Sequence, residues 1–193
     1  MPPFVEPITT IIGHGQSPIG KKWGSRIDET IVVRLKDPSW QNKQDYGTRV
    51  DYMCSSTETL PVMLDYKKVP KQYFGQPKKG TWNPTVEASF RSRAQAPLTI
   101  PIDLFLTWNA IFKTLGREEV RNFSLGMFAI LCACEFLKAE EIKLVGFDNL
   151  LDPDKLDYHK ANKGKWHSGH DWKAENRMLP LIEEKYGVRI ASF

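Results

Sequence analysis

Short runs of β-branched and apolar residues, each closed by turn-forming or polar residues, constrain the fold of this chain most strongly. Three such runs open the sequence, at residues 8–12, 29–35 and 49–54. Runs of this length are typical of strands that are buried on both faces, as in the parallel sheet of an α/β protein. A fourth run, 60–64, contains Pro61, which disfavours a place in the middle of a sheet.

The second half of the chain alternates helical and strand patterns. Apolar residues at helical spacing predict helices over 101–115, 125–138 and 170–186. Short apolar runs predict strands at 141–147 and 188–191. This alternation of strand and helix predicts a mostly parallel central sheet that is covered by helices on both faces.

Length and composition indicate one domain over residues 1–193. Of these residues, 41% are apolar and 26% are charged, which is enough apolar surface for a sizeable core and excludes wholesale disorder. The irregular segment 66–97 predicts an insertion on the surface, either a binding lid or a solvated loop. The net charge of +4 suits an anionic small molecule as well as nucleic acid, so it does not separate these two partners.

The apolar stretches and the first residues do not suggest a membrane, and the cysteines do not suggest an oxidising compartment. Charges interrupt every long apolar stretch, and the first residues lack the basic start and apolar block of a signal peptide. Cys54, Cys132 and Cys134 lack metal-ligand spacing with histidine, so they are expected to be buried free thiols. These features favour a cytoplasmic protein, bacterial or viral, with no membrane insertion.

Two places could bind an anion. Gly13, His14 and Gly15 follow the first predicted strand, where glycines let backbone N–H groups approach a phosphate. The alternative is that they only form a tight turn. Ser124 and Gly126 begin a predicted helix, whose first N–H groups can hold an anion. The alternative there is that Ser124 only caps the helix.

A third place is a cluster of histidines, because His159, His167 and His170 lie within twelve residues. No cysteine or tight histidine spacing accompanies them, which argues against a zinc site. A histidine at the start of a helix can instead serve as a general base near neutral pH, and the helix places Glu175 near His170. Solvated loop positions are the alternative for His159 and His167.

These places match three known motifs in order and in separation. The segments 11–14 (Ile-Ile-Gly-His), 27–36 and 46–50 resemble a long motif that runs Val-Val-Gly-Asn, then Ile-Asp through Arg to Asn, then Val-Gly-Ser-Arg-Thr. The segment 123–147, from Phe-Ser-Leu-Gly to Gly-Phe, resembles a short motif. The segment 170–175 is a His-x4-Glu motif. The chain therefore resembles the animal-type sialyltransferases, glycosyltransferase family twenty-nine, and more loosely the bacterial sialyltransferases, as a short and divergent member.

The resemblance implies a fold and an activity. The fold would be a single Rossmann-like catalytic domain, the sialyltransferase variant of the GT-A type. The activity would be inverting and metal-independent transfer of a sugar from a nucleotide donor to a hydroxyl of a glycan or other acceptor, with CMP-sialic acid as one candidate donor. No cofactor is implied beyond this co-substrate. His170 would be the general base, and Glu175 would fix its helix or ring. The donor-binding residues implied are Gly13, His14, Gly15, Arg34, Lys36, Ser124, Gly126, Gly146 and His159.

The chain departs from the family pattern at four positions. The two donor-binding asparagines of the family fall on His14 and Lys36, and its two disulfide cysteines fall on Thr9 and Ala139. Two other functions therefore stay open. One is a noncatalytic nucleotide- or glycan-binding relative. The other is a modifier of a viral or bacterial polymer or nucleic acid, which would use the basic segment 67–79.

Overall fold

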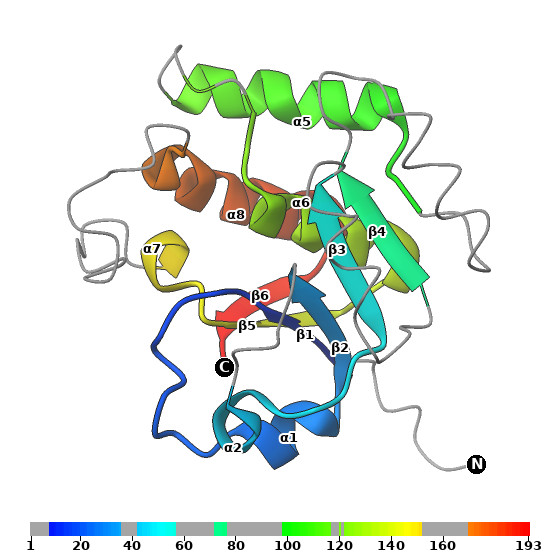
Figure 1. Ribbon diagram of the computed structural model, residues 1–193. Helices are drawn as coiled ribbons and strands as arrows, with labels where there is room; N and C mark the ends of the chain where they lie inside the picture. The colour runs from blue at the N-terminus through cyan, green and yellow to red at the C-terminus, as the bar shows by residue number, and fades with distance from the viewer. Residues whose placement is uncertain are drawn as a thin grey trace.

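The computed structural model describes residues 8–35, 42–56, 72–76, 98–116, 120, 122–151 and 170–193. Within these residues the strands form one sheet in which every pair is parallel, in the order β4-β3-β2-β1-β5-β6 (Figure 1). The strands are β1 Ile8–Ile12, β2 Ile31–Leu35, β3 Tyr52–Ser56, β4 Gln72–Gln76, β5 Glu141–Val145 and β6 Arg189–Ser192.

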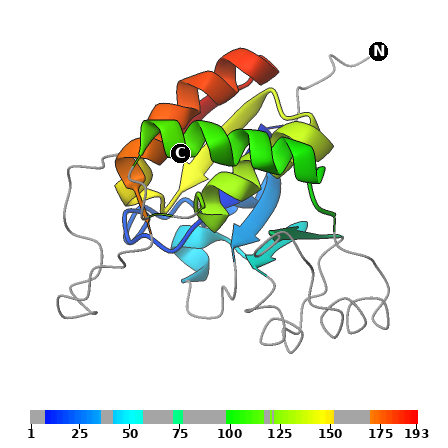
Figure 2. The same cartoon turned by 90° about the horizontal axis from the view of Figure 1, so that it is seen from above.

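Helices cover both faces of this sheet. One face carries α6 and α8, with α5 as an outer layer beyond them, and the other face carries α1 and α2 (Figure 1 and Figure 2). The helices are α1 Gly24–Asp28, α2 Lys43–Tyr46, α5 Ile102–Leu115, α6 Leu125–Cys132, α7 Asp148–Leu151 and α8 Trp172–Tyr186. The predicted α/β fold with a central parallel sheet between helices is confirmed. No described helix has the length and apolar character needed to cross a membrane.

The strand order places a switch point between β1 and β5. The chain leaves β1 through α1 to reach β2 on one side, whereas β5 pairs with the other side of β1. Ile12 lies opposite Val145 in this pair, so the loops that follow both strands start side by side. Open α/β sheets bind their ligands in the crevice outside the carboxyl ends of the strands at such a point.

The two sides of β1, β2 and β5 build two apolar clusters. Ile11 and Val33 face the larger cluster with α5, α6 and α8, whereas Ile12 and Val32 face a smaller one with α1 and α2. Because both faces are covered, β1 and β2 are buried on both sides, as their sequence predicts. The three cysteines are free and buried in the larger cluster, as expected.

Several elements differ from their sequence-based expectation. The segment 66–97 contains β4, which pairs with β3. Its sequence, Gln-Tyr-Phe-Gly-Gln, places two strand-favouring aromatic residues beside a glycine that disfavours strands, so the segment alone does not mark a strand. The helix expected over 125–138 is an α-helix only to Cys132 and continues as a π-helix over Ala133–Leu137. The run 60–64 lies outside the described residues.

Candidate functional site

The loop after β1 packs tightly against the loop after β5. The N–H groups of Gly13 and Gly15 donate to the carbonyl oxygens of Val145 and Gly146, at 2.8 Å each. A Cβ atom at Gly13 would lie 2.7 Å from the Gly146 carbonyl oxygen. Gly146 itself has a φ of +68°, in the left-handed region that glycine tolerates best. The glycines therefore let two backbones approach each other at the switch point.

Four more N–H groups of this loop, residues 13–23 (the β1 loop), donate to carboxylates of the protein. Gln16 and Ser17 donate to Oδ2 of Asp148, at 2.9 and 3.1 Å. Gly20 and Lys22 donate to Asp45, at 2.9 Å each. We expected backbone N–H groups of this loop to bind a phosphate. In the structure, carboxylates of the protein itself already accept hydrogen bonds from these four.

Ser124 has two roles at the start of α6. Its Oγ accepts a hydrogen bond from the Met127 N–H at 3.3 Å, so it is the N-cap of the helix. The same residue donates twice to Glu175, from its N–H to Oε1 at 2.8 Å and from its Oγ to Oε2 at 2.6 Å. Ser124 thus ties the start of α6 to the first turn of α8.

The side chain of Phe147 lies between the β1 loop and α6. A Cβ atom at Gly126 would lie 2.6 Å from one edge of this ring, and one at Gly13 would lie 3.1 Å from the other edge. Both glycines therefore contact the same ring. The structure brings together Gly13, Gly126 and Gly146 at the carboxyl ends of β1 and β5.

Glu175 is a carboxyl group with no exposure to solvent. Burial raises the pKa of Glu175 from 4.5 to about 7, although the two hydrogen bonds from Ser124 act in the opposite direction. Nearby, the Asp171 carboxylate raises it further and also caps α8 by accepting from the Ala174 N–H at 3.1 Å. Glu175 can therefore gain or lose a proton near neutral pH.

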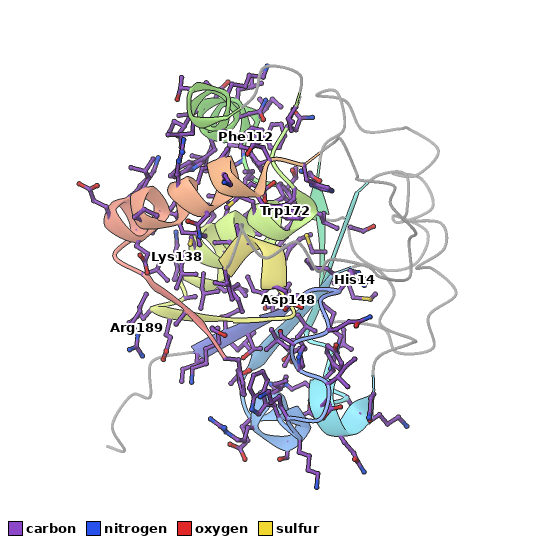
Figure 3. The ribbon with its side chains drawn as sticks, turned by 90° about the vertical axis from the view of Figure 1, so that its left-hand side faces the viewer. His14, Phe112, Lys138, Asp148, Trp172 and Arg189 are labelled. Carbon is purple, nitrogen blue, oxygen red and sulfur yellow. The ribbon has the colours of Figure 1, made fainter. Side chains whose placement is uncertain are left out.

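His170 lies directly before α8, at the same end of the sheet. Its imidazole is half-buried and stacks on the indole of Trp172, with ring centroids 4.6 Å apart and an interplanar angle of 15°. In the view of Figure 3, His14 and Asp148 lie at the level of the sheet and Trp172 lies above them at the start of α8. This stacking holds the plane of the imidazole nearly parallel to the indole, which limits its rotation as a positioned base requires.

The other sequence-predicted residues fall into two groups. Arg34 is 2% exposed, and its guanidinium donates to the carbonyl oxygens of Tyr46 and Arg49 at 2.8 Å each, so it supports the segment that follows α2. Lys36 and His159 lie outside the described residues. Within the part of the chain that is described, no three His, Cys, Asp or Glu side chains gather in a way that could hold a metal ion.

Four residues of this region were missed by sequence reasoning. Asp148 and Asp45 accept N–H groups of the β1 loop, the Tyr46 hydroxyl donates to the Gly15 carbonyl oxygen at 2.8 Å, and Trp172 stacks on His170. Asp148 could have been found, because it stands two residues after Gly146 at the end of a predicted strand. No sequence signal predicts these contacts of Tyr46 and Asp45, because their partners are 31 and 25 residues away.

The comparisons with known proteins agree on one fold. The sequence matches no protein-family model and no curated protein. Sialyltransferase CstII from Campylobacter jejuni, solved with the substrate analogue cytidine-5'-monophosphate, superposes with a TM-score of 0.61 at 16% identity, over 97% of this chain and 79% of that one. A mammalian sialyltransferase gives 0.59 at 15% identity, over 96% and 68%. An apo alpha-2,3-sialyltransferase from Campylobacter jejuni gives 0.61 at 17% identity, over 97% and 75%. This chain therefore has the fold of the sialyltransferases.

Proposed function

We propose that this chain is an inverting, metal-independent glycosyltransferase that moves a sugar from a nucleotide donor to a hydroxyl acceptor. The donor proposed first is CMP-sialic acid. The observation that carries the proposal is the pair of hydrogen bonds between Ser124 and Glu175. These bonds connect the start of α8, next to His170, with the start of α6, beside the switch point. The shared fold supports it, because the same fold was solved with cytidine-5'-monophosphate in a Campylobacter enzyme.

On the donor side, the start of α6 is the proposed place for the phosphate. The N–H groups of Leu125 and Gly126 begin the helix and have no acceptor in a preceding turn. Their partial positive charge favours an anion there when the neighbouring Glu175 is protonated, which its raised pKa allows near neutral pH. Gly13, His14 and Gly15 would face the nucleoside across the switch point, and Lys36 would complete the donor side.

On the acceptor side, His170 is the proposed general base. It would take the proton of the acceptor hydroxyl while the hydroxyl oxygen attacks the anomeric carbon of the donor sugar. The bond between that carbon and the phosphate oxygen would break, and the nucleotide would leave with the electron pair, so the anomeric centre would invert. His159 would stabilise the leaving phosphate. Proton transfer of this kind contributes about 10²–10⁴-fold to a rate.

Glu175 has a positioning role in this scheme. Its carboxyl group holds the N-cap of α6, which binds the donor, and it belongs to the first turn of α8, which follows His170. The two substrates would therefore be held by helix starts that cannot shift independently. Orientation of this kind is a large part of the rate advantage of an enzyme.

A thermal-shift screen across CMP, UDP, GDP and their sugars tests the donor. Stabilisation by CMP or a CMP-sugar alone is the expected result, and a ligand at about 100 times its dissociation constant adds about 2.7 kcal/mol to the free energy of unfolding. Transfer assayed with the stabilising donor should be unchanged by EDTA. Stabilisation by another nucleotide, or activity that EDTA removes and magnesium or manganese restores, would overturn the corresponding part of the proposal.

A second candidate function is binding of a nucleotide or glycan without catalysis. One observation favours it, namely that the N–H groups of Gly13, Gly15, Gln16 and Ser17 in the β1 loop already have acceptors in the protein. Binding of CMP with no transfer to any hydroxyl acceptor would support this candidate over the first.

A further inference from the structure

The β1 loop contains a pair of N–H groups that converge on one negatively charged atom. Gln16 and Ser17 are consecutive in the chain, and both donate to Oδ2 of Asp148, at 2.9 and 3.1 Å. Consecutive N–H groups that point at one place form a nest that binds anions, and in nucleotide-binding folds the loop after the first strand often holds a phosphate in this way. Here the nest contains a carboxylate of the protein itself.

Gly15 is what lets this carboxylate approach the loop. A Cβ atom at Gly15 would lie 2.7 Å from Cγ and from both oxygens of Asp148, closer than any side chain tolerates. The second oxygen, Oδ1, is buried and has no hydrogen-bond partner among the described residues. The Asp148 carboxylate therefore fills the nest, and its second oxygen is buried.

A second carboxylate holds the other end of the same loop. Asp45 accepts from the N–H groups of Gly20 and Lys22, and the next residue, Tyr46, donates its hydroxyl to the Gly15 carbonyl oxygen. Burial raises the pKa of Tyr46 to about 12, and the carboxylates of Asp148 and Asp45 add to this rise. Both carboxylates therefore act on the Tyr46 hydroxyl, but only Asp148 accepts from the Gln16 and Ser17 N–H groups.

We propose that Asp148 determines phosphate number: its carboxylate takes the place of a phosphate in the β1 loop, so the site accepts a nucleotide with one phosphate and rejects one with two. This inference rests on the proposed function. A single phosphate would bind to the N–H groups at the start of α6. In doubly wound folds a diphosphate lies over the loop after the first strand. Here a second phosphate would find the Gln16 and Ser17 N–H groups engaged and would be repelled by a like charge.

The experiment compares Asp148→Asn with Asp45→Asn. Both variants remove one carboxylate that accepts two N–H groups of the same loop, so Asp45→Asn controls for loosening of the loop. Calorimetry gives the dissociation constants of CMP and CDP, and thermal shift gives the stabilisation by inorganic pyrophosphate. Asp148→Ser, measured in the same way, is a second variant in case Asp148→Asn does not fold.

The wild type and Asp45→Asn should bind CMP about tenfold more tightly than CDP, a difference of about 1.4 kcal/mol, and should gain nothing from pyrophosphate. Asp148→Asn should lose most of this preference and be stabilised by pyrophosphate. An unchanged preference in both Asp148 variants, or an equal change in Asp45→Asn, would overturn the inference. If CMP does not bind the wild type but pyrophosphate stabilises only the Asp148 variants, the proposed donor is wrong and the role of Asp148 stands. If CMP binds but pyrophosphate stabilises neither Asp148 variant, the inference falls and the proposed donor stands.

Discussion

The β1 loop differs from the junction of α6 with α8, where Ser124 is hydrogen-bonded to Glu175, in how its N–H groups are used. Each offers backbone N–H groups at the carboxyl end of the sheet, and each has a carboxyl group that accepts some of them. In the loop, the N–H groups of Gly20 and Lys22 lower the pKa of Asp45 below its ordinary value. At the junction, burial raises the pKa of Glu175 to about 7, and the hydrogen bonds from Ser124 only partly offset this.

The difference shows what decides whether a helix start or a glycine-rich turn can receive a ligand. The loop is closed by permanent acceptors on both sides, Asp148 and Asp45. At the junction Glu175 accepts the N–H of Ser124. The next N–H groups of α6, those of Leu125 and Gly126, can therefore bind a ligand. The local sequence at both places is favourable for binding an anion. Carboxyl groups from distant parts of the chain, Asp148 and Glu175, decide which N–H groups can bind a ligand.

Replacement of His170 should have the largest effect. His170→Ala should lower the transfer rate by about 10²–10⁴-fold, because it removes the proposed general base. The affinity for CMP and the melting temperature should stay nearly unchanged, since the imidazole is not part of the α6 junction. The rate of the wild type should rise with pH through a group with a pKa near that of histidine, about 6.5 before perturbation. A variant with the same rate and a stability about 1 kcal/mol lower would instead make His170 only a helix-start residue.

The pH dependence of stability separates the two carboxyl groups. A group whose pKa is raised by folding, such as Glu175, stabilises most below its ordinary pKa of 4.5, and this contribution is lost as the pH rises through about 7. A shift of this size corresponds to about 3 kcal/mol. Glu175→Gln should therefore flatten the fall in unfolding free energy between pH 4.5 and about 7, measured by denaturant unfolding.

Asp45→Asn is the matched control, with the opposite sign. The pKa of Asp45 is lowered by folding, so its contribution is present above the ordinary value of 3.8 and is lost as the pH falls below it. Asp45→Asn should flatten the acid side of the profile and leave the range near pH 7 unchanged. Equal pH profiles for the two variants would contradict the contrast between loop and junction.

A methyl group at Gly15 should have a smaller effect, confined to the loop. Gly15→Ala places a Cβ atom 2.7 Å from the Asp148 carboxyl group and should lower the unfolding free energy by about 1–3 kcal/mol. In an Asp148→Ala background the same change should cost clearly less, because the clashing group is absent. A double-mutant cycle measures this coupling. Additive effects would show that Gly15 is needed for a reason other than its contact with Asp148.

Much of the fold was predictable because its signals are local. Ile8–Ile12 and Ile31–Leu35 are β-branched runs with turn residues after them, and their parallel pairing follows from the helices between strands. β4 was missed because the strand Gln72–Gln76 depends on pairing with β3 and with Leu98, which its own sequence does not reveal. In the site, the Ser124 N-cap was readable from the sequence. Its bonds to Glu175, 51 residues away, and those of Asp148 to Ser17, 131 residues away, depend on the completed sheet.

A crystal structure of the complex with CMP tests the contrast between loop and junction most directly. The phosphate should accept hydrogen bonds from the N–H groups of Leu125 and Gly126 at the start of α6, with Glu175 still bound to Ser124. The N–H groups of Gln16 and Ser17 should remain on Asp148, as they are without ligand. A phosphate bound by Gln16 and Ser17, with the Asp148 carboxylate displaced, would contradict the assignment of the two regions.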